Sequence, residues 1–239
     1  MEKVYSMKTY AIVIRDHEIS EHGFNGLLTS SFKVKNDFEI NRFDAVVPKD
    51  VDKLLDMYKL KWNYPWSGEI VDFASGLVKR AYVTANPKSR IAAALSHFTL
   101  WQKASCMDEP ILILEHDACF NYKMDLTADR LDKVRADIIG INNPLGCTRK
   151  ASMYYQKIIN NQYMFQPAPY IDDLKVPQGL AGNSAYIIKP SGAIKMLKLV
   201  EEYGLWPNDA IMCKQLVPNL YVTRKFYTTI QNLRSTTTQ

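Results

Sequence analysis

The stretch Ile111-Leu112-Ile113-Leu114-Glu115-His116-Asp117 decides the fold class of this chain. Four consecutive apolar residues bounded by polar ones are typical of a short strand buried on both faces, as in a parallel α/β sheet. In open sheets of that kind, ligands bind outside the carboxyl ends of the strands. Glu115, His116 and Asp117 follow such an end, so the sequence predicts a site there. The alternative is a solvated loop in which His116 is incidental.

A helix is predicted directly before this strand, over residues 88–104. Its apolar residues recur at a period near 3.6 and form one face. They are Ile91, Ala94, Leu95, Phe98 and Trp101. Ser96 and His97 lie within this helix, but adjacent helical residues point in different directions, so they cannot form a nucleophile–base pair. We expect His97 to be a buried, hydrogen-bonded structural residue.

Strands and helices alternate along the rest of the chain, which indicates an α/β domain with a central, mostly parallel sheet flanked by helices. Strands are predicted over residues 10–14, 38–47, 137–141 and 185–188, and helices from 48, from 190 to 204 and from 208 to 216. The proline-containing stretch 146–182 reads as a long irregular acceptor-side loop. We expect one domain over 1–239, with a donor-binding half at about 8–142, acceptor-side elements at about 143–225 and a flexible tail at about 226–239.

Composition limits the class of protein. With 239 residues, 47% of them hydrophobic, the chain can bury one large core. No apolar stretch reaches the ~20 residues that cross a bilayer, and residues 1–6 lack the apolar core of a signal peptide, so we expect a cytoplasmic protein without a transmembrane segment. Its four cysteines form no C-x-x-C pair, which argues against a disulfide framework or a structural zinc site.

Charge and aromatic residues suggest anionic partners without choosing among them. The net charge of +5 would attract a phosphorylated donor, a phosphorylated glycan or nucleic acid. The loop Trp62–Gly68 and the segment Arg224–Tyr227 carry aromatic side chains that suit sugar or base stacking. The alternative for the loop is that its aromatic side chains pack over the core. The alternative for the segment is that it is a solvated terminus.

A set of short motifs, in this order, resembles glycosyltransferase family 25, which includes bacterial lipooligosaccharide galactosyltransferases, collagen galactosyltransferases and bacteriophage-borne relatives. The similarity spans the chain from about Ile12 to about Leu220, and the whole sequence looks most like the phage-borne members. The motifs are Ala94-Leu95-Ser96-His97, Leu100-Trp101, Ile113-Leu114-Glu115-His116-Asp117-Ala118, Gly182-Asn183-Ser184-Ala185-Tyr186-Ile187-Ile188, Gly192-Ala193 and Asp209.

The resemblance implies a GT-A-like fold, a nucleotide-sugar donor, expected to be a UDP-sugar, and a divalent cation, Mn²⁺ or Mg²⁺. The family's usual acidic motif is Glu-Asp-Asp, from which Glu115-His116-Asp117 departs at the middle position. Histidine also ligates manganese, so Asp117 and His116 are the candidate metal ligands. Glu115, His116, Asp117 and Arg90 are the candidate donor-binding residues, with Arg90 contacting phosphate.

Asp209 is the candidate catalytic residue, because the family motif places an acid there and a carboxylate can accept the proton of the attacking hydroxyl. A base opposite the leaving group would invert the anomeric carbon. The alternative is that Asn208 or Asp209 caps a helix.

The acceptor is a hydroxyl on either of two molecules. The net positive charge, the aromatic loops and the phage-like sequence favour a hydroxymethylated base in phage DNA. In that case the protein works in the host cytoplasm. A glycan of the lipooligosaccharide type is the alternative, and a non-catalytic nucleotide-sugar or nucleic-acid binding module is the alternative of another class. The oligomeric state stays open.

Overall fold

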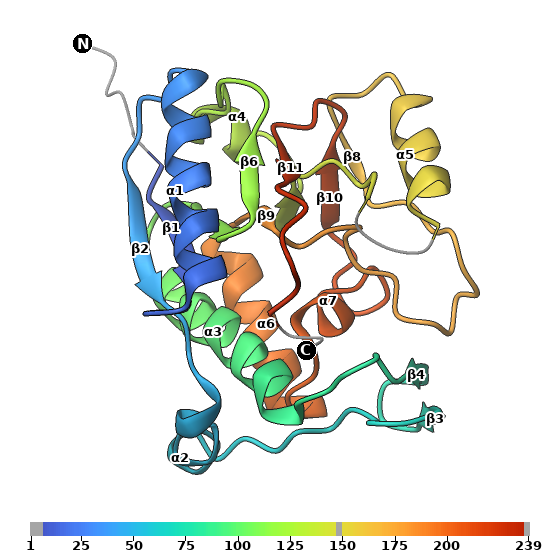
Figure 1. The fold of residues 1–239 in the computed structure, drawn as a ribbon. Helices are drawn as coiled ribbons and strands as arrows, with labels where there is room; N and C mark the ends of the chain where they lie inside the picture. Colours follow the sequence, from blue (N-terminus) through green and yellow to red (C-terminus); the bar gives the residue numbers. More distant parts are fainter. Residues whose placement is uncertain (1–6, 147–149, 237–239) are drawn as a thin grey trace.

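A seven-stranded sheet lies at the centre of the structure, a computed structural model that describes residues 7–146 and 150–236 (Figure 1). The strand order is β2-β1-β5-β9-β7-β10-β8. Five strands run parallel, and β9 and β8 run against them. The bounds are β1 Thr9–Val13, β2 Ile40–Asp44, β5 Ile111–Glu115, β7 Ile138–Gly140, β8 Phe165–Pro167, β9 Ala185–Ile188 and β10 Leu220–Thr223.

Strand β5 is buried on both faces, as its apolar run predicts. Ile111 and Ile113 pack into one hydrophobic cluster, whereas Leu112 and Leu114 pack into another on the opposite face. Side chains alternate between the two faces of a strand, so a strand with a core on each side needs apolar residues at every position. The neighbouring β9 repeats this division.

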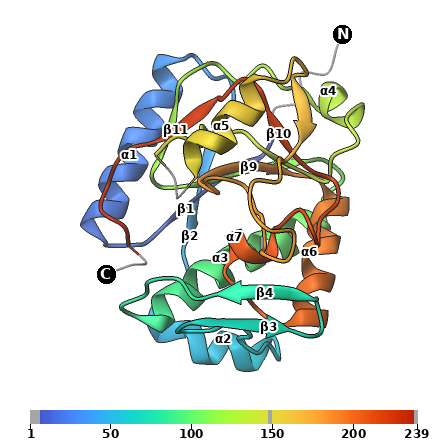
Figure 2. The same ribbon diagram turned by 90° about the vertical axis from the view of Figure 1, so that its right-hand side faces the viewer.

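Helices cover both faces of the sheet, as the two views show (Figures 1 and 2). The first cluster contains side chains of α2 (Val51–Met57), α3 (Pro87–Ser105), α5 (Ala151–Ile159), α6 (Pro190–Tyr203) and α7 (Asn208–Ile211). The second contains side chains of α1 (Glu18–Lys33), β6 (Ala118–Phe120) and α4 (Ala128–Asp132). A short 3₁₀ turn, Pro48–Asp50, leads into α2. The predicted α/β class with a mostly parallel, helix-flanked sheet is confirmed.

Two local predictions are wrong. The stretch expected to be irregular contains α5 and β8, and Pro167 is accepted because β8 is an edge strand, where a missing N–H costs no ladder bond. The helix expected to reach Leu216 ends at Ile211, because the chain turns there and Cys213 forms an isolated bridge with Gly179.

The segment expected to be a flexible tail includes β11 (Thr228–Ile230), which pairs antiparallel with β6. Gln231 follows it and contacts the loop that contains His116. Residues 1–6, used above to argue against a signal peptide, Cys147 and residues 237–239 lie outside the described residues.

Within 7–146 and 150–236, no helix is both long and apolar enough to span a bilayer. In the same part of the chain, Cys106, Cys119 and Cys213 are unpaired thiols.

A buried lysine fixes the hairpin of β3 (Glu69–Asp72) and β4 (Leu77–Arg80), which lies at the bottom of both views (Figures 1 and 2). Lys79 is fully buried, pairs with Asp72 at 3.0 Å and donates to the Asn63 carbonyl at 2.8 Å. Its ammonium lies 3.9 Å from the centroid of the Trp206 ring. The lysine therefore connects the hairpin to the approach to α7.

We expect Lys79→Ala to lower the free energy of unfolding by about 3 kcal/mol, because it leaves Asp72 as an uncompensated buried charge. Arg80→Ala is the matched control on the same strand: Arg80 pairs with Glu69 where both side chains are exposed, which predicts a loss below about 1 kcal/mol. Urea unfolding of both variants checks the difference. Equal losses would show that the buried pair does not hold the hairpin.

Candidate active site

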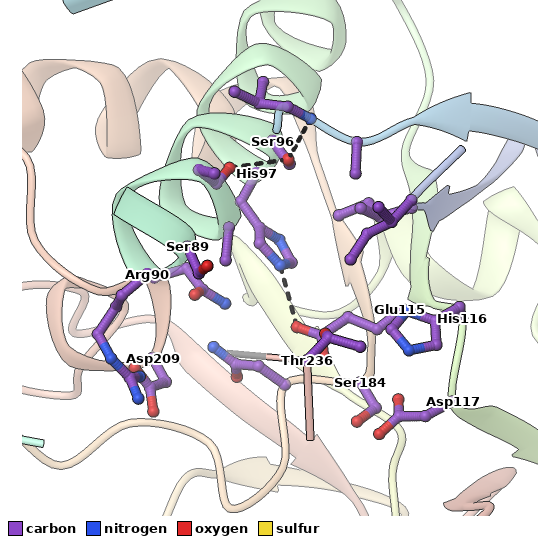
Figure 3. Close-up of a pocket in the computed structure, with 18 of the residues that line it drawn as sticks. Ser89, Arg90, Ser96, His97, Glu115, His116, Asp117, Ser184, Asp209 and Thr236 are labelled. Carbon is purple, nitrogen blue, oxygen red and sulfur yellow. Dashed lines mark hydrogen bonds and ion pairs between the residues drawn. The ribbon is translucent and has the colours of Figure 1, made fainter. Parts of the chain in front are cut away.

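A cavity of about 430 Å³ opens at the carboxyl end of β5 (Figure 3). It is lined by Glu115, His116 and Asp117 from β5 and the loop after it, by Arg90 from the start of α3, and by Asp209 from α7. We call it the carboxylate cavity after its three acidic residues. The structure thus brings together all five side chains that the sequence proposed for donor binding, metal binding and catalysis. Glu115 and Asp117 lie on one side of the cavity and Asp209 and Arg90 on the other.

A chain of buried hydrogen bonds holds Glu115. His97 is 2% exposed; its Nδ1 lies 2.8 Å from the Tyr186 hydroxyl, and its Nε2 lies 3.1 Å from Glu115 Oε1. Trp101 Nε1 donates to the same hydroxyl at 2.9 Å. Indole N–H only donates, so the hydroxyl accepts from Trp101 and its own proton is free to donate to His97 Nδ1; in that arrangement the proton on Nε2 donates to Glu115. His97 is the buried, hydrogen-bonded residue expected, and it also orients a cavity carboxylate.

Removing the hydroxyl at the centre of this chain should be costly. We expect Tyr186→Phe to destabilise the protein by about 2 kcal/mol, because Trp101 Nε1 and His97 Nδ1 are then left buried without a partner. Tyr154→Phe is the matched control: its ring is nearly as buried, but its hydroxyl donates only a long bond, 3.4 Å to the Gly179 carbonyl, and its loss leaves no side-chain donor unpaired, so a loss under about 1 kcal/mol is expected. Denaturant titration measures both, and a Tyr186→Phe protein as stable as wild type would contradict the hydrogen-bond chain.

The Asp117 carboxylate is incompletely satisfied. Burial, followed by the charge of Glu115, raises its pKa from 3.8 to about 7. Its Oδ1 atom is buried with no hydrogen-bond partner among the described residues. Both side-chain polar atoms of Asn183, another residue of this cavity, are in the same condition. Native proteins rarely leave buried polar atoms unpaired, so this cluster is suited to a polar ligand.

His116 packs its ring against α1 at Gly23, where an added Cβ would lie 3.1 Å from the ring and 2.8 Å from the His116 carbonyl oxygen. Only glycine leaves room for the loop at this position. Burial lowers the pKa of His116, which favours the neutral imidazole, the form that binds metals.

Asp209 occupies the first turn of α7, a short helix whose N-cap is Pro207, so neither Asn208 nor Asp209 is the cap. Burial raises the pKa of Asp209, the Arg90 charge opposes that shift, and the Glu115 charge adds to it. Arg90 is held in place by bonds from Nε to Thr84 Oγ1 at 2.8 Å and from its other end to the Val83 carbonyl at 3.1 Å.

Gln231 fixes the loop after β5 from the far end of the sequence. Its Nε2 lies 2.8 Å from the Gly23 carbonyl, 3.2 Å from that of His116 and 2.9 Å from that of Ala118, and its backbone N–H donates to the Asp117 carbonyl. Sequence reasoning missed this residue, because no local pattern marks a glutamine that bonds to a loop more than a hundred positions away.

The residues present fit a divalent cation bound together with a phosphate ligand. No group of three or more His, Cys, Asp or Glu side chains converges within the described residues, so a site made of protein ligands alone is not formed there. Mg²⁺ and similar ions, however, are commonly held by one or two carboxylates plus substrate phosphates. The buried, unpartnered Oδ1 of Asp117 is such a ligand atom.

Comparison with known proteins identifies the family. The profile of glycosyltransferase family 25 (LPS biosynthesis protein) matches residues 21–212. No curated protein matches the chain. Among solved structures, apo mouse xyloside xylosyltransferase 1 is 11% identical with a TM-score of 0.45, over 90% of this chain and 83% of that one. The apo structure of the bifunctional glycosyltransferase WbbM is 10% identical with a TM-score of 0.41, over 92% of this chain and 39% of that one.

The family match defines a glycosyltransferase. The chain belongs to glycosyltransferase family 25, because the family profile covers most of its length. Its reaction therefore uses an activated sugar donor and an acceptor.

Proposed function

We propose that the carboxylate cavity binds a nucleotide-sugar, with a UDP-sugar as the first candidate. The observation that carries this proposal is the meeting of Glu115, His116, Asp117, Arg90 and Asp209 in one cavity of about 430 Å³, within the ~300–1,000 Å³ typical of small-molecule sites. Its unpaired polar atoms, on Asp117 and Asn183, support a polar ligand.

The charges of the cavity support a divalent cation, Mn²⁺ or Mg²⁺. Three carboxylates and one arginine line it, and His116 favours its neutral form, so a diphosphate alone would be repelled. Asp117 and His116 are the proposed ligands. When bound, such an ion offsets the negative charge that develops on a departing diphosphate. Arg90 would contact the phosphates, and Glu115, held by His97, would accept hydrogen bonds from the donor.

Asp209 is the proposed general base. Across the cavity from Asp117, it would take the proton of the acceptor hydroxyl as that oxygen attacks the anomeric carbon (Figure 3). The bond from the anomeric carbon to the phosphate oxygen breaks, and its electron pair leaves with the nucleoside diphosphate. Attack from the face opposite the leaving group inverts the anomeric carbon, which NMR of the product checks.

The acceptor proposals are a hydroxymethylated base in DNA, favoured by sequence, and a glycan hydroxyl. The cytoplasm, or a host's cytoplasm for a phage-encoded chain, is the corresponding proposed location. Binding to DNA through several phosphates would weaken steeply as salt rises.

Donor hydrolysis tests the proposed function. Wild type with Mn²⁺ and a panel of nucleotide-sugars should release free nucleotide slowly, and Asp117→Ala should abolish the release. Thermal shift with and without metal identifies the donor, because a ligand that binds the native state raises its apparent stability. Binding of a nucleotide-sugar without turnover, for every donor and acceptor, would favour the non-catalytic binding module instead.

A further inference from the structure

A second cavity, of about 570 Å³, adjoins the carboxylate cavity. We call it the tyrosine cavity, because Tyr64, Tyr82 and Tyr154 line it. The two cavities share three wall residues, Tyr82, Leu180 and Asp209. The proposed base therefore lines both cavities.

We infer that the tyrosine cavity binds the acceptor, and that this acceptor is an uncharged carbohydrate. The inference rests on the proposed function, because it places the acceptor hydroxyl at Asp209 and the donor in the carboxylate cavity. The hydroxyl oxygen bonds to the anomeric carbon where the two cavities meet, and its proton passes to Asp209. The bond from that carbon to the phosphate oxygen breaks, and its electron pair leaves with the nucleoside diphosphate in the carboxylate cavity.

The position of Asp209 supports this arrangement. Two causes raise the pKa of both Tyr64 and Tyr82: burial is the larger, and the negative charge of Asp209 is the second. The Asp209 carboxylate therefore lies near both hydroxyls. On the other side, Arg90 lies over the Tyr82 ring, 5.0 Å from its centroid. Asp209 can therefore reach a hydroxyl in the tyrosine cavity and a sugar in the carboxylate cavity.

The charges of the tyrosine cavity argue against a nucleic-acid backbone. Its two cations are already paired: Arg80 with Glu69 at 2.6 Å, and Lys150 with Asp172 at 3.0 Å. With Asp209 added, the lining carries no surplus of positive charge. DNA presents about one negative charge per 1.7 Å of helix axis, so it binds where a surface carries a surplus of positive charge.

The shape and surface of the tyrosine cavity suit a sugar. The rings of Tyr64 and Tyr82 stack with centroids 5.7 Å apart and an interplanar angle of 13°, which gives the wall flat, amphipathic side chains. Another part of the lining is held by Gln178, whose buried side chain accepts from the Ile171 and Asp172 N–H groups and donates to the Asp172 and Asp173 carbonyls. A preformed, neutral pocket lowers the ordering cost of binding an uncharged ligand.

A reciprocal pair of variants tests the inference. Ala181 lines only the tyrosine cavity and Ala93 only the carboxylate cavity, so Ala181→Trp and Ala93→Trp each fill one of them. Ala181→Trp should reduce binding of methyl hexosides, methyl pentosides and short neutral oligosaccharides at least about tenfold, while the Kd for UDP with Mn²⁺ changes less than about twofold. Ala93→Trp should do the reverse. Saturation-transfer NMR and calorimetry measure the two ligands separately.

Other outcomes overturn the inference. They are loss of UDP binding in Ala181→Trp, absence of binding by every neutral sugar to wild type, and salt-sensitive binding of hydroxymethylated duplex DNA that Ala181→Trp weakens. Circular dichroism checks folding, and Ala181→Leu replaces the tryptophan variant if that variant unfolds. Sugar binding is measured in the absence of a donor, and UDP binding is measured separately. If the nucleotide-sugar proposal fails, the wild-type protein will bind no nucleotide, whatever the result of the sugar measurement.

Discussion

Asp117→Asn should make the metal-free protein more stable at pH 8 and at the same time remove glycosyl transfer. The folded chain holds Asp117 where burial and the Glu115 charge raise its pKa to about 7, against 3.8 for the ordinary group. Below about pH 4 the Asp117 carboxyl is protonated in both the folded and the unfolded chain, so it does not change the free energy of unfolding. As pH rises toward 7 and above, the folded chain must ionise a buried group, so its stability falls.

The expected gain in the free energy of unfolding follows from the same pKa values. A rise from 3.8 to about 7 corresponds to at most about 4 kcal/mol, and solvent screening at a half-buried group reduces this to about 2 kcal/mol. The asparagine variant should exceed wild type by that amount at pH 8 in the presence of a chelator, and the gap should close toward pH 4. The exposed Asp129→Asn is the control for the loss of one carboxylate, and it should not reproduce this gain at pH 8. A variant less stable than wild type at pH 8 would contradict the unfavourable ionisation of Asp117 in the folded protein, which its single hydrogen-bonding side chain, Ser184, only partly offsets.

Asp209→Asn should lower kcat for transfer by about 10² to 10⁴, the usual contribution of a general base, and leave the Kd for UDP with Mn²⁺ nearly unchanged. Asparagine keeps the size of the side chain and the turn of α7 but cannot accept the proton. Single-turnover kinetics with saturating donor measures the loss. Full activity in this variant would move the base to another acid.

The pH profile gives a second readout for Asp209. Burial and Glu115 raise its pKa, so the acid limb of kcat/KM should lie above the ordinary 3.8. Arg90 lowers that pKa, so Arg90→Ala should move the limb to still higher pH. Movement to lower pH would contradict the assigned base, because the loss of a nearby cation cannot stabilise a carboxylate.

The sheet was predictable where burial alone dictates the residue type. Ile111, Leu112, Ile113 and Leu114 face two cores in turn, so their apolar run carries the signal without help from other segments. β8 gave no such signal: Pro167 is a strand breaker in a sequence, and only its place at the sheet edge makes it acceptable. The helix predicted from residue 208 to 216 is too long. The end of α7 is set by a tertiary bridge between Cys213 and Gly179 rather than by a local capping pattern.

That the candidate site residues would lie together was predictable from the sequence, but the contacts that hold them in place were not. Carboxylates at a strand end could be read directly, and the family motif added Asp209. The hydrogen bond from His97 to Glu115 joins a helix to a strand end, and Gln231 reaches the same loop from β11. Such contacts depend on the three-dimensional path of the chain, which one sequence does not reveal. The tyrosine cavity likewise gathers side chains from five separate segments.

The reversed direction of β9 has an evolutionary consequence. Ala185, the first residue of β9, pairs with Leu114, near the end of β5, so the long segment before β9 reaches the same edge of the sheet as the acidic loop. Insertions, deletions or recombination between residues 169 and 179, after β8 and before the first of these residues to line the carboxylate cavity, can remodel that rim and leave the parallel strands and the carboxylates of β5 untouched. Descendants of this chain could therefore exchange one sugar-receiving molecule for another in few genetic steps, with the nucleotide preference inherited intact.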